Sequence, residues 1–106
     1  MAVTENFGQM VVLSEGLSAD GDTALFRYLH GTKPANLYIG GNLGGGSVRL
    51  MALSPSDEWV EMDAAIVKAG MYVISTNSFI GKCVLVGATT PDLDVYIQGS
   101  VVEYTE

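Results

Sequence analysis

Short stretches in which apolar and polar residues alternate recur along this chain of 106 residues. Between residues 93 and 98, for example, Leu93, Val95 and Ile97 alternate with Asp94, Tyr96 and Gln98. Successive side chains of a β-strand point to opposite faces of a sheet, so this period of two predicts strands with one buried face. The pattern and the turn residues between its repeats predict strands at residues 9–14, 23–30, 35–39, 47–53, 58–62, 70–76, 79–86, 93–98 and 101–104.

The stretch from residue 38 to residue 63 organises the rest of the prediction. Its seven residues 40–46 include five glycines, and residues 54–57 read Ser-Pro-Ser-Asp. Both segments are typical of turns, because glycine accepts positive φ angles and Ser, Pro and Asp favour reversals. We therefore expect three strands joined by two hairpin turns, with the other strands added to this meander.

Individual side chains can be assigned to faces within these strands. In residues 58–62 we expect Val60 and Met62 to face the core, while Trp59 and Glu61 face away. Residues 63–68 fit either a short strand or one helical turn capped by Asp63. Residues 79–86 form the most apolar strand and are expected at the centre of a sheet, whereas residues 101–104 are expected at an edge.

Nine short segments at intervals of roughly 8–12 residues are typical of an all-β protein. We predict a single β-sandwich or jelly-roll-like domain over residues 9–106, with about eight or nine antiparallel strands. Residues 1–8 are predicted to be an N-terminal arm that is loose or docks on a neighbour.

Composition and charge narrow the range of partners. The net charge of −7 argues against nucleic acid and against anionic membranes, since both require Lys and Arg. Hydrophobic residues make up 48% of the chain and charged residues only 16%, which favours contact with another protein or with copies of itself. The first residues lack the pattern of a signal peptide, and no apolar run is long enough to span a membrane as a helix.

Candidate chemistry is sparse, and we predict a protein that is not an enzyme and needs no metal or cofactor. His30 is the only histidine and has no catalytic motif near it. Cys83 is the only cysteine and lies in an apolar run, as a buried thiol would. Asp20 and Asp22 lack the further ligands of a calcium loop, so an ordinary turn is the better interpretation.

Other patterns also favour structure over chemistry. Glu58 and Glu61 would point to opposite faces of a strand and could not act as an acid–base pair. The glycine run 40–46 lacks the Lys-Ser/Thr and the helix of a phosphate-binding loop. Trp59 and five tyrosines could stack on sugar rings, although core and subunit contacts are the alternative for such aromatic residues.

The order of turn and strand signals over residues 38–98 resembles small virion proteins of tailed bacteriophages. The shared features begin with a glycine-rich turn at residues 40–46, an apolar strand at 47–53, a Ser-Pro turn and a Trp-Val pair. They continue with Ala69-Gly70, the segment 86–89 that reads Val-Gly-Ala-Thr, a proline and an alternating strand. The chain departs from the family pattern before Trp59, where extra glycines are usual. It also has Gly-Lys-Cys at residues 81–83, where an arginine is common in the family.

The resemblance implies a capsid decoration, or cement, protein on the capsid surface of a virion, which stabilises the shell by bridging its subunits. Its partners would be the major capsid protein, other virion proteins or further copies of itself, and no catalytic residues are implied. The expected contact residues are Phe7, Asp57, Glu58, Trp59, Glu61 and Asp63. The alternatives are a carbohydrate- or receptor-binding module at a tail tip, favoured by aromatics along an exposed groove, and a neck or tail connector subunit.

Overall fold

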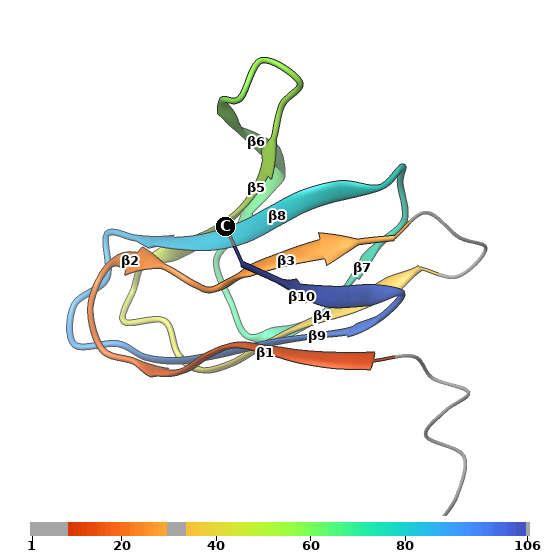
Figure 1. The fold of residues 1–106 in the computed structure, drawn as a ribbon. Helices are drawn as coiled ribbons and strands as arrows, with labels where there is room; N and C mark the ends of the chain where they lie inside the picture. The colour runs from red at the N-terminus through yellow and green to blue at the C-terminus, as the bar shows by residue number, and fades with distance from the viewer. Residues whose placement is uncertain (1–8, 30–33, 106) are drawn as a thin grey trace, which may run out of the picture.

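The computed structural model describes residues 9–29 and 34–105, and these residues form ten strands (Figure 1). The predicted N-terminal arm at residues 1–8 lies outside the described residues, as does His30. The strands are β1 (Gln9–Leu17), β2 (Gly21–Asp22), β3 (Leu25–Tyr28), β4 (Ala35–Asn42), β5 (Ser47–Leu53), β6 (Trp59–Ile66), β7 (Gly70–Ile74), β8 (Phe79–Val86), β9 (Asp92–Gly99) and β10 (Val101–Tyr104).

The strands build two antiparallel sheets packed into one β-sandwich, as the alternation predicts. Sheet A has four strands in the order β1-β9-β4-β7. Sheet B has the order β10-β3-β8-β5-β6, and the short β2 also pairs with β8. The predicted central position of β8 and edge position of β10 are both confirmed.

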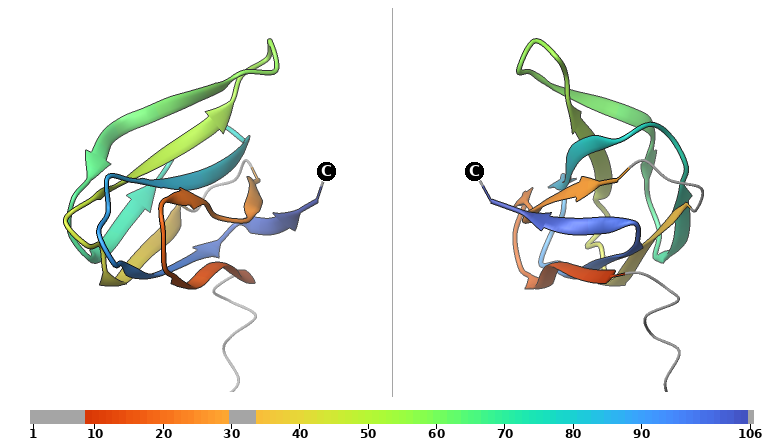
Figure 2. Two further views of the ribbon diagram at one scale, coloured as in Figure 1. Left: turned by 90° about the vertical axis from the view of Figure 1, so that its left-hand side faces the viewer. Right: turned by 45° about the vertical axis from the view of Figure 1, so that its right-hand side comes forward.

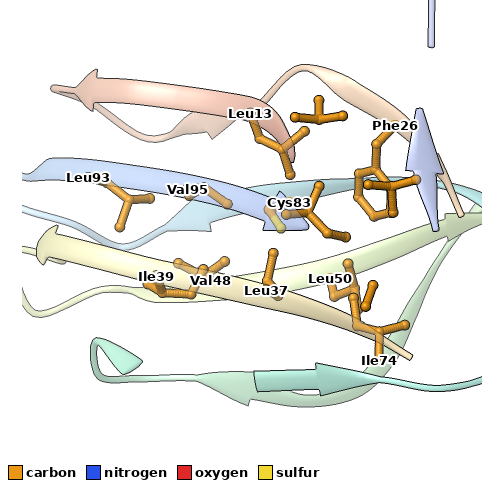
Figure 3. Packing of buried hydrophobic residues seen from close by; sticks show 14 of the residues in the cluster. Leu13, Phe26, Leu37, Ile39, Val48, Leu50, Ile74, Cys83, Leu93 and Val95 are labelled. Carbon is orange, nitrogen blue, oxygen red and sulfur yellow. The ribbon is translucent and has the colours of Figure 1, made fainter. Parts of the chain in front are cut away.

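The inward-facing residues of the two sheets form a single apolar core (Figure 3). The alternation is regular: Ala35, Leu37 and Ile39 of β4 are buried, and Asn36 and Tyr38 between them are exposed. Burying these side chains is the main favourable contribution to folding. The side chains that are less than 2% exposed include Tyr28, Phe26, Leu37, Ile39, Leu85, Leu93, Ile97, Val48, Val95, Val101 and Cys83.

The glycine-rich turn is not a hairpin, and this corrects the predicted meander. Strands β4 and β5 belong to different sheets, so residues 43–46 carry the chain from sheet A across to sheet B. The crossing packs closely: the amide of Thr89 donates a hydrogen bond to the carbonyl of Gly44 at 2.8 Å, and Asn42 Oδ1 accepts one from the Gly44 amide, also at 2.8 Å. Turn composition shows that the chain reverses, but it does not show whether the flanking strands pair.

The second turn does close a hairpin, between β5 and β6, and its tip extends beyond the rest of the sandwich (Figure 2). Strand β6 continues to Ile66, which decides between the two interpretations of residues 63–68 in favour of a strand. The predicted inward position of Val60 is wrong, since its side chain is 47% exposed. Near the hairpin tip no facing sheet remains to cover either side of β6, whereas Met62 lies further in and packs against the core.

Two glycine substitutions test how closely the chain packs where it crosses between the sheets. Gly44 and Gly45 have φ angles of +63° and +78°, but only at Gly44 would an added Cβ meet other atoms, with the carbonyl oxygen of Thr89 2.5 Å away. We expect Gly45→Ala to lower the free energy of unfolding by about 1–2 kcal/mol through backbone strain alone. Gly44→Ala should cost at least about 1 kcal/mol more, because the crossing must also open. Urea unfolding of both variants measures the difference, and equal losses would contradict a packed crossing.

The buried cysteine generates a second prediction. Cys83 is fully buried, its amide donates to Thr23 Oγ1 at 3.0 Å, and burial raises the pKa of its thiol to about 12. Because the thiolate is the reactive form, Cys83 should not react with Ellman's reagent at pH 8 until the protein unfolds. A Val67→Cys variant, whose new thiol replaces a side chain that is 69% exposed, should react at once and serves as the control. Rapid modification of the native protein would show that the core opens around β8.

Candidate interaction face

The outward surface of sheet B carries charged side chains that are paired within the chain. Arg49 lies 3.2 Å from Glu61, and Lys82 lies 2.7 Å from Asp22. The ammonium group of Lys82 also lies 4.4 Å from the centre of the Trp59 ring, a cation–π contact. This surface resembles the solvated side of an ordinary antiparallel sheet.

The outward surface of sheet A is different, because two rows of uncharged side chains cross all four strands. One row is Met10, Gln98, Asn36 and Val73, and the other is Val12, Tyr96, Tyr38 and Met71. We call these eight residues the A face. Five of the nine large apolar side chains that are exposed in the described part of the chain belong to it: Met10, Val12, Tyr38, Met71 and Val73.

Two stacked tyrosines occupy the middle of the A face. The rings of Tyr38 and Tyr96 have centroids 5.6 Å apart and planes inclined by 18°. The ring of Tyr38 lies over Gly40, where an added Cβ would come within 2.6 Å of ring carbons. Glycine at position 40 therefore lets the Tyr38 ring lie against the sheet. Part of this ring remains accessible to solvent, since Tyr38 is 40% exposed.

Carboxylates border one end of the A face and are engaged by neighbouring groups. The hydroxyl of Tyr96 donates to Glu15 Oε2 at 3.3 Å, and the amide of Gly16 donates to Asp94 Oδ1 at 2.9 Å. Desolvation raises the pKa of the Tyr96 phenol, and the charge and hydrogen bond of Glu15 raise it further. Glu15 thus holds the hydroxyl of Tyr96, Asp94 holds the backbone at Gly16, and the centre of the face is left uncharged.

The two aspartates considered for calcium have structural roles. The carboxylate of Asp20 accepts the amides of Gly87 and Ala88 at 2.8 and 2.9 Å, while Asp22 pairs with Lys82. Among the described residues, no group of three or more His, Cys, Asp or Glu side chains is arranged to hold a metal ion. The Asp-Gly-Asp sequence is therefore used to hold the loop after β8 and the surface of sheet B.

The predicted contact residues do not lie on the A face. Phe7 and the side chain of Asp63 lie outside the described part of the chain. Asp57 and Glu58 are exposed at the β5–β6 tip, where the Ser54 hydroxyl accepts the Glu58 amide at 3.1 Å. Trp59 lies beside Lys82 and Glu61 pairs with Arg49, so these two side chains already have partners within the chain.

The A face could have been found only in part from the sequence. The alternation places Tyr96 and Gln98 on the outside of their strand, as observed. The signal that points to the face is the set of exposed apolar residues at outward positions of β1, β4 and β7. That signal becomes visible only when the strand order is known, since β1 and β9 are separated by most of the chain.

A scan against protein-family models and searches of curated proteins and of solved structures found no match to this chain. No helix in the described part of the chain is long and apolar enough to cross a membrane.

The pair formed by Tyr96 and Glu15 generates a test by titration. The pKa of Tyr96 lies above its ordinary value of 10.0, so the neutral phenol is favoured in the folded state. The stability linked to this group is present below pH 10 and is lost as the pH rises through the higher folded pKa. Glu15→Gln should lower the pKa of Tyr96, followed by the NMR signals of its ring. Asp57→Asn removes the same charge at the hairpin tip and should leave that pKa unchanged; an equal shift in both variants would contradict a local effect.

Proposed function

We propose that this protein is a non-enzymatic structural subunit that binds another protein through the A face. The single observation that carries the proposal is a pair of uncharged rows across the four strands of one sheet, which hold five exposed large apolar side chains on β1, β4 and β7. Large contiguous apolar patches are uncommon on monomeric proteins and mark interaction sites. Depletion of charge with enrichment in Met and Tyr is also typical of the centre of protein interfaces.

The order of motifs in the sequence supports a proposal for the assembly in which this subunit takes part. The motif order over residues 38–98 resembles small virion proteins of tailed bacteriophages, and we propose a capsid decoration protein that bridges neighbouring subunits of the shell. Such a role needs extensive contact and no chemistry. The acidic border of the A face, with Glu15 and Asp94, would favour a partner surface whose rim is basic.

A carbohydrate- or receptor-binding module is the second candidate, and the tyrosine pair is the observation that favours it. Sugar rings stack on exposed aromatic rings, and Tyr38 lies against the sheet with the amide of Asn36 two residues away on the same face. Exposed Met71 and Val73 on the adjacent strand favour a protein partner, because a glycan would leave both of these apolar side chains in water.

Two valine substitutions test the proposed interface. Val12 on the A face and Val86 on sheet B are 41% and 40% exposed, so Val12→Lys and Val86→Lys place the same charge at equally exposed positions. We expect Val12→Lys to weaken incorporation into phage particles at least tenfold, roughly the effect of 1.4 kcal/mol, because the lysine must be desolvated at the interface. Val86→Lys should be incorporated as the unchanged protein is. Equal incorporation of both variants would contradict an interface at the A face.

Imaging of the same particles separates the possible assemblies. Density repeated over the capsid lattice, with shells that lose heat resistance when the gene is removed, would support decoration. Density confined to the neck or tail would replace decoration with the connector or receptor-binding role. Binding to glycans that is lost in Tyr38→Ala but retained in Val12→Lys would favour the second candidate.

A further inference from the structure

A groove opens on the side of the sandwich where the two sheets end, between β6 of sheet B and β7 of sheet A. It encloses about 560 Å³. Core residues Leu37, Leu50 and Ile74 line its inner part, and Met62, Ile66 and Tyr72 line its sides. Figure 3 shows Leu37, Leu50 and Ile74 close together at this side of the core. The groove therefore reaches in as far as buried residues of the hydrophobic core.

Both walls of the groove are sheet edges. In the described part of the chain β7 pairs only with β4, and β6 pairs only with β5. An edge strand presents unpaired backbone N–H and C=O groups along its free side. The groove thus combines apolar space with a row of backbone donors and acceptors, a combination that suits an extended polypeptide, which can add a strand to the edge. A lipid or other apolar small molecule would use only the apolar space.

The sequence offers an occupant of the right length and pattern. Residues 1–8 precede β1, and Met1, Val3, Glu5 and Phe7 occupy alternate positions. In an extended segment these four side chains share one face, three of them apolar. Eight extended residues span about 26–29 Å, which exceeds the roughly 17 Å of a five-residue strand such as β7.

The groove and the N-terminal segment also carry opposite charges. Lys68 is the one charged residue among the described residues that line the groove, and it makes no ion pair with any described residue. Its carbonyl accepts a hydrogen bond from the hydroxyl of Tyr72 at 2.7 Å, so the backbone of this connection is held beside the groove. Glu5 is the one charged residue of the alternating face in residues 1–8 and could pair with Lys68.

The strand order favours insertion of residues 1–8 into the groove of a second copy over insertion into the groove of the same copy. β1 and β7 are the two opposite edges of sheet A, three strand spacings apart, or about 14 Å. A segment that begins at β1 would have to cross the whole sheet to reach its own groove. A neighbouring copy whose β1 edge lies beside β7 could insert the same segment directly.

We propose that the groove between β6 and β7 binds the N-terminal segment, residues 1–8, of a second copy of this chain as a strand added beside β7. This contact would link copies edge to edge in one direction, so that repetition would close a ring or extend a chain. The groove shares Val73 with the A face, and its other lining residues lie outside the A face.

Disulfide trapping between two separately substituted proteins tests the contact directly. Copies with Val3→Cys, Glu5→Cys or Phe7→Cys, which scan the alternating face, are mixed with copies that carry Val67→Cys on the groove, where the native valine is 69% exposed. The buried native Cys83 should remain silent. Mild oxidation should give a mixed disulfide dimer for at least one of the three positions, since a bridge needs Cα atoms less than about 7 Å apart.

Val60→Cys is the matched control, because Val60 is 47% exposed but lies on the hairpin away from the groove. Equal trapping with Val60→Cys, or none with Val67→Cys at any of the three positions, would overturn the proposal. A single chain can also carry one of the N-terminal cysteines together with Val67→Cys. If this chain forms an efficient internal disulfide, and the separately substituted proteins form no mixed dimers, the second-copy assignment is overturned. The Val12→Lys substitution should leave trapping unchanged, so failure of the A-face proposal and failure of this one can be distinguished.

A charge exchange in the full-length protein gives an independent measurement. Glu5→Lys or Lys68→Glu alone should weaken self-association several-fold in sedimentation equilibrium, and the double variant should restore it. Unchanged thermal unfolding of diluted samples would show that each variant is folded. Self-association that is insensitive to both single changes, or a double variant weaker than either, would contradict the contact between Glu5 and Lys68.

Discussion

The shared core between the two sheets is the constraint on which the rest of this structure depends. Every long strand must turn alternate residues inward, and the residues between them are then fixed on the outside. In β9, for instance, burying Val95 and Ile97 places Tyr96 and Gln98 on the outer surface. The core therefore determines which residues face out but not their chemical type. The outer surface of sheet B carries the ion pairs Arg49–Glu61 and Lys82–Asp22, whereas sheet A carries five of the nine large apolar side chains that are exposed in the described residues.

The alternation and the turn residues are enough to predict the all-β class and nine of the ten strands, but not the two-residue β2. They also placed β8 at the centre of a sheet, since its residues are apolar on both sides, and β10 at an edge. They did not determine which strands pair. Pairing depends on contacts between distant segments, such as Val11 with Ile97, and a period of two is the same for every partner. This is why the glycine-rich turn was interpreted as a hairpin when it joins the two sheets.

The candidate site was harder to predict for the same reason. Apart from Phe7, the expected contact residues form a local group along the chain, from Asp57 to Asp63. The A face is assembled from four strands, with Met10, Gln98, Asn36 and Val73 side by side in one row. Trp59 illustrates the same limit, because its outward position follows from the alternation, whereas its contact with Lys82 of β8 depends on the strand order.

Strand β7 connects the two surfaces for which we propose partners. Its outward residues Met71 and Val73 belong to the A face, its inward residues Tyr72 and Ile74 line the groove, and its free edge is the one an added strand would pair with. A strand added there would continue sheet A, so it would widen the A face by one strand spacing of about 4.8 Å and cover the groove. Self-association would then enlarge the surface available to a partner protein. With a net charge of −7 on each copy, apolar contact and the local pair of Glu5 with Lys68 would have to outweigh repulsion between the copies, and screening at physiological ionic strength limits that repulsion to charges within about 8 Å.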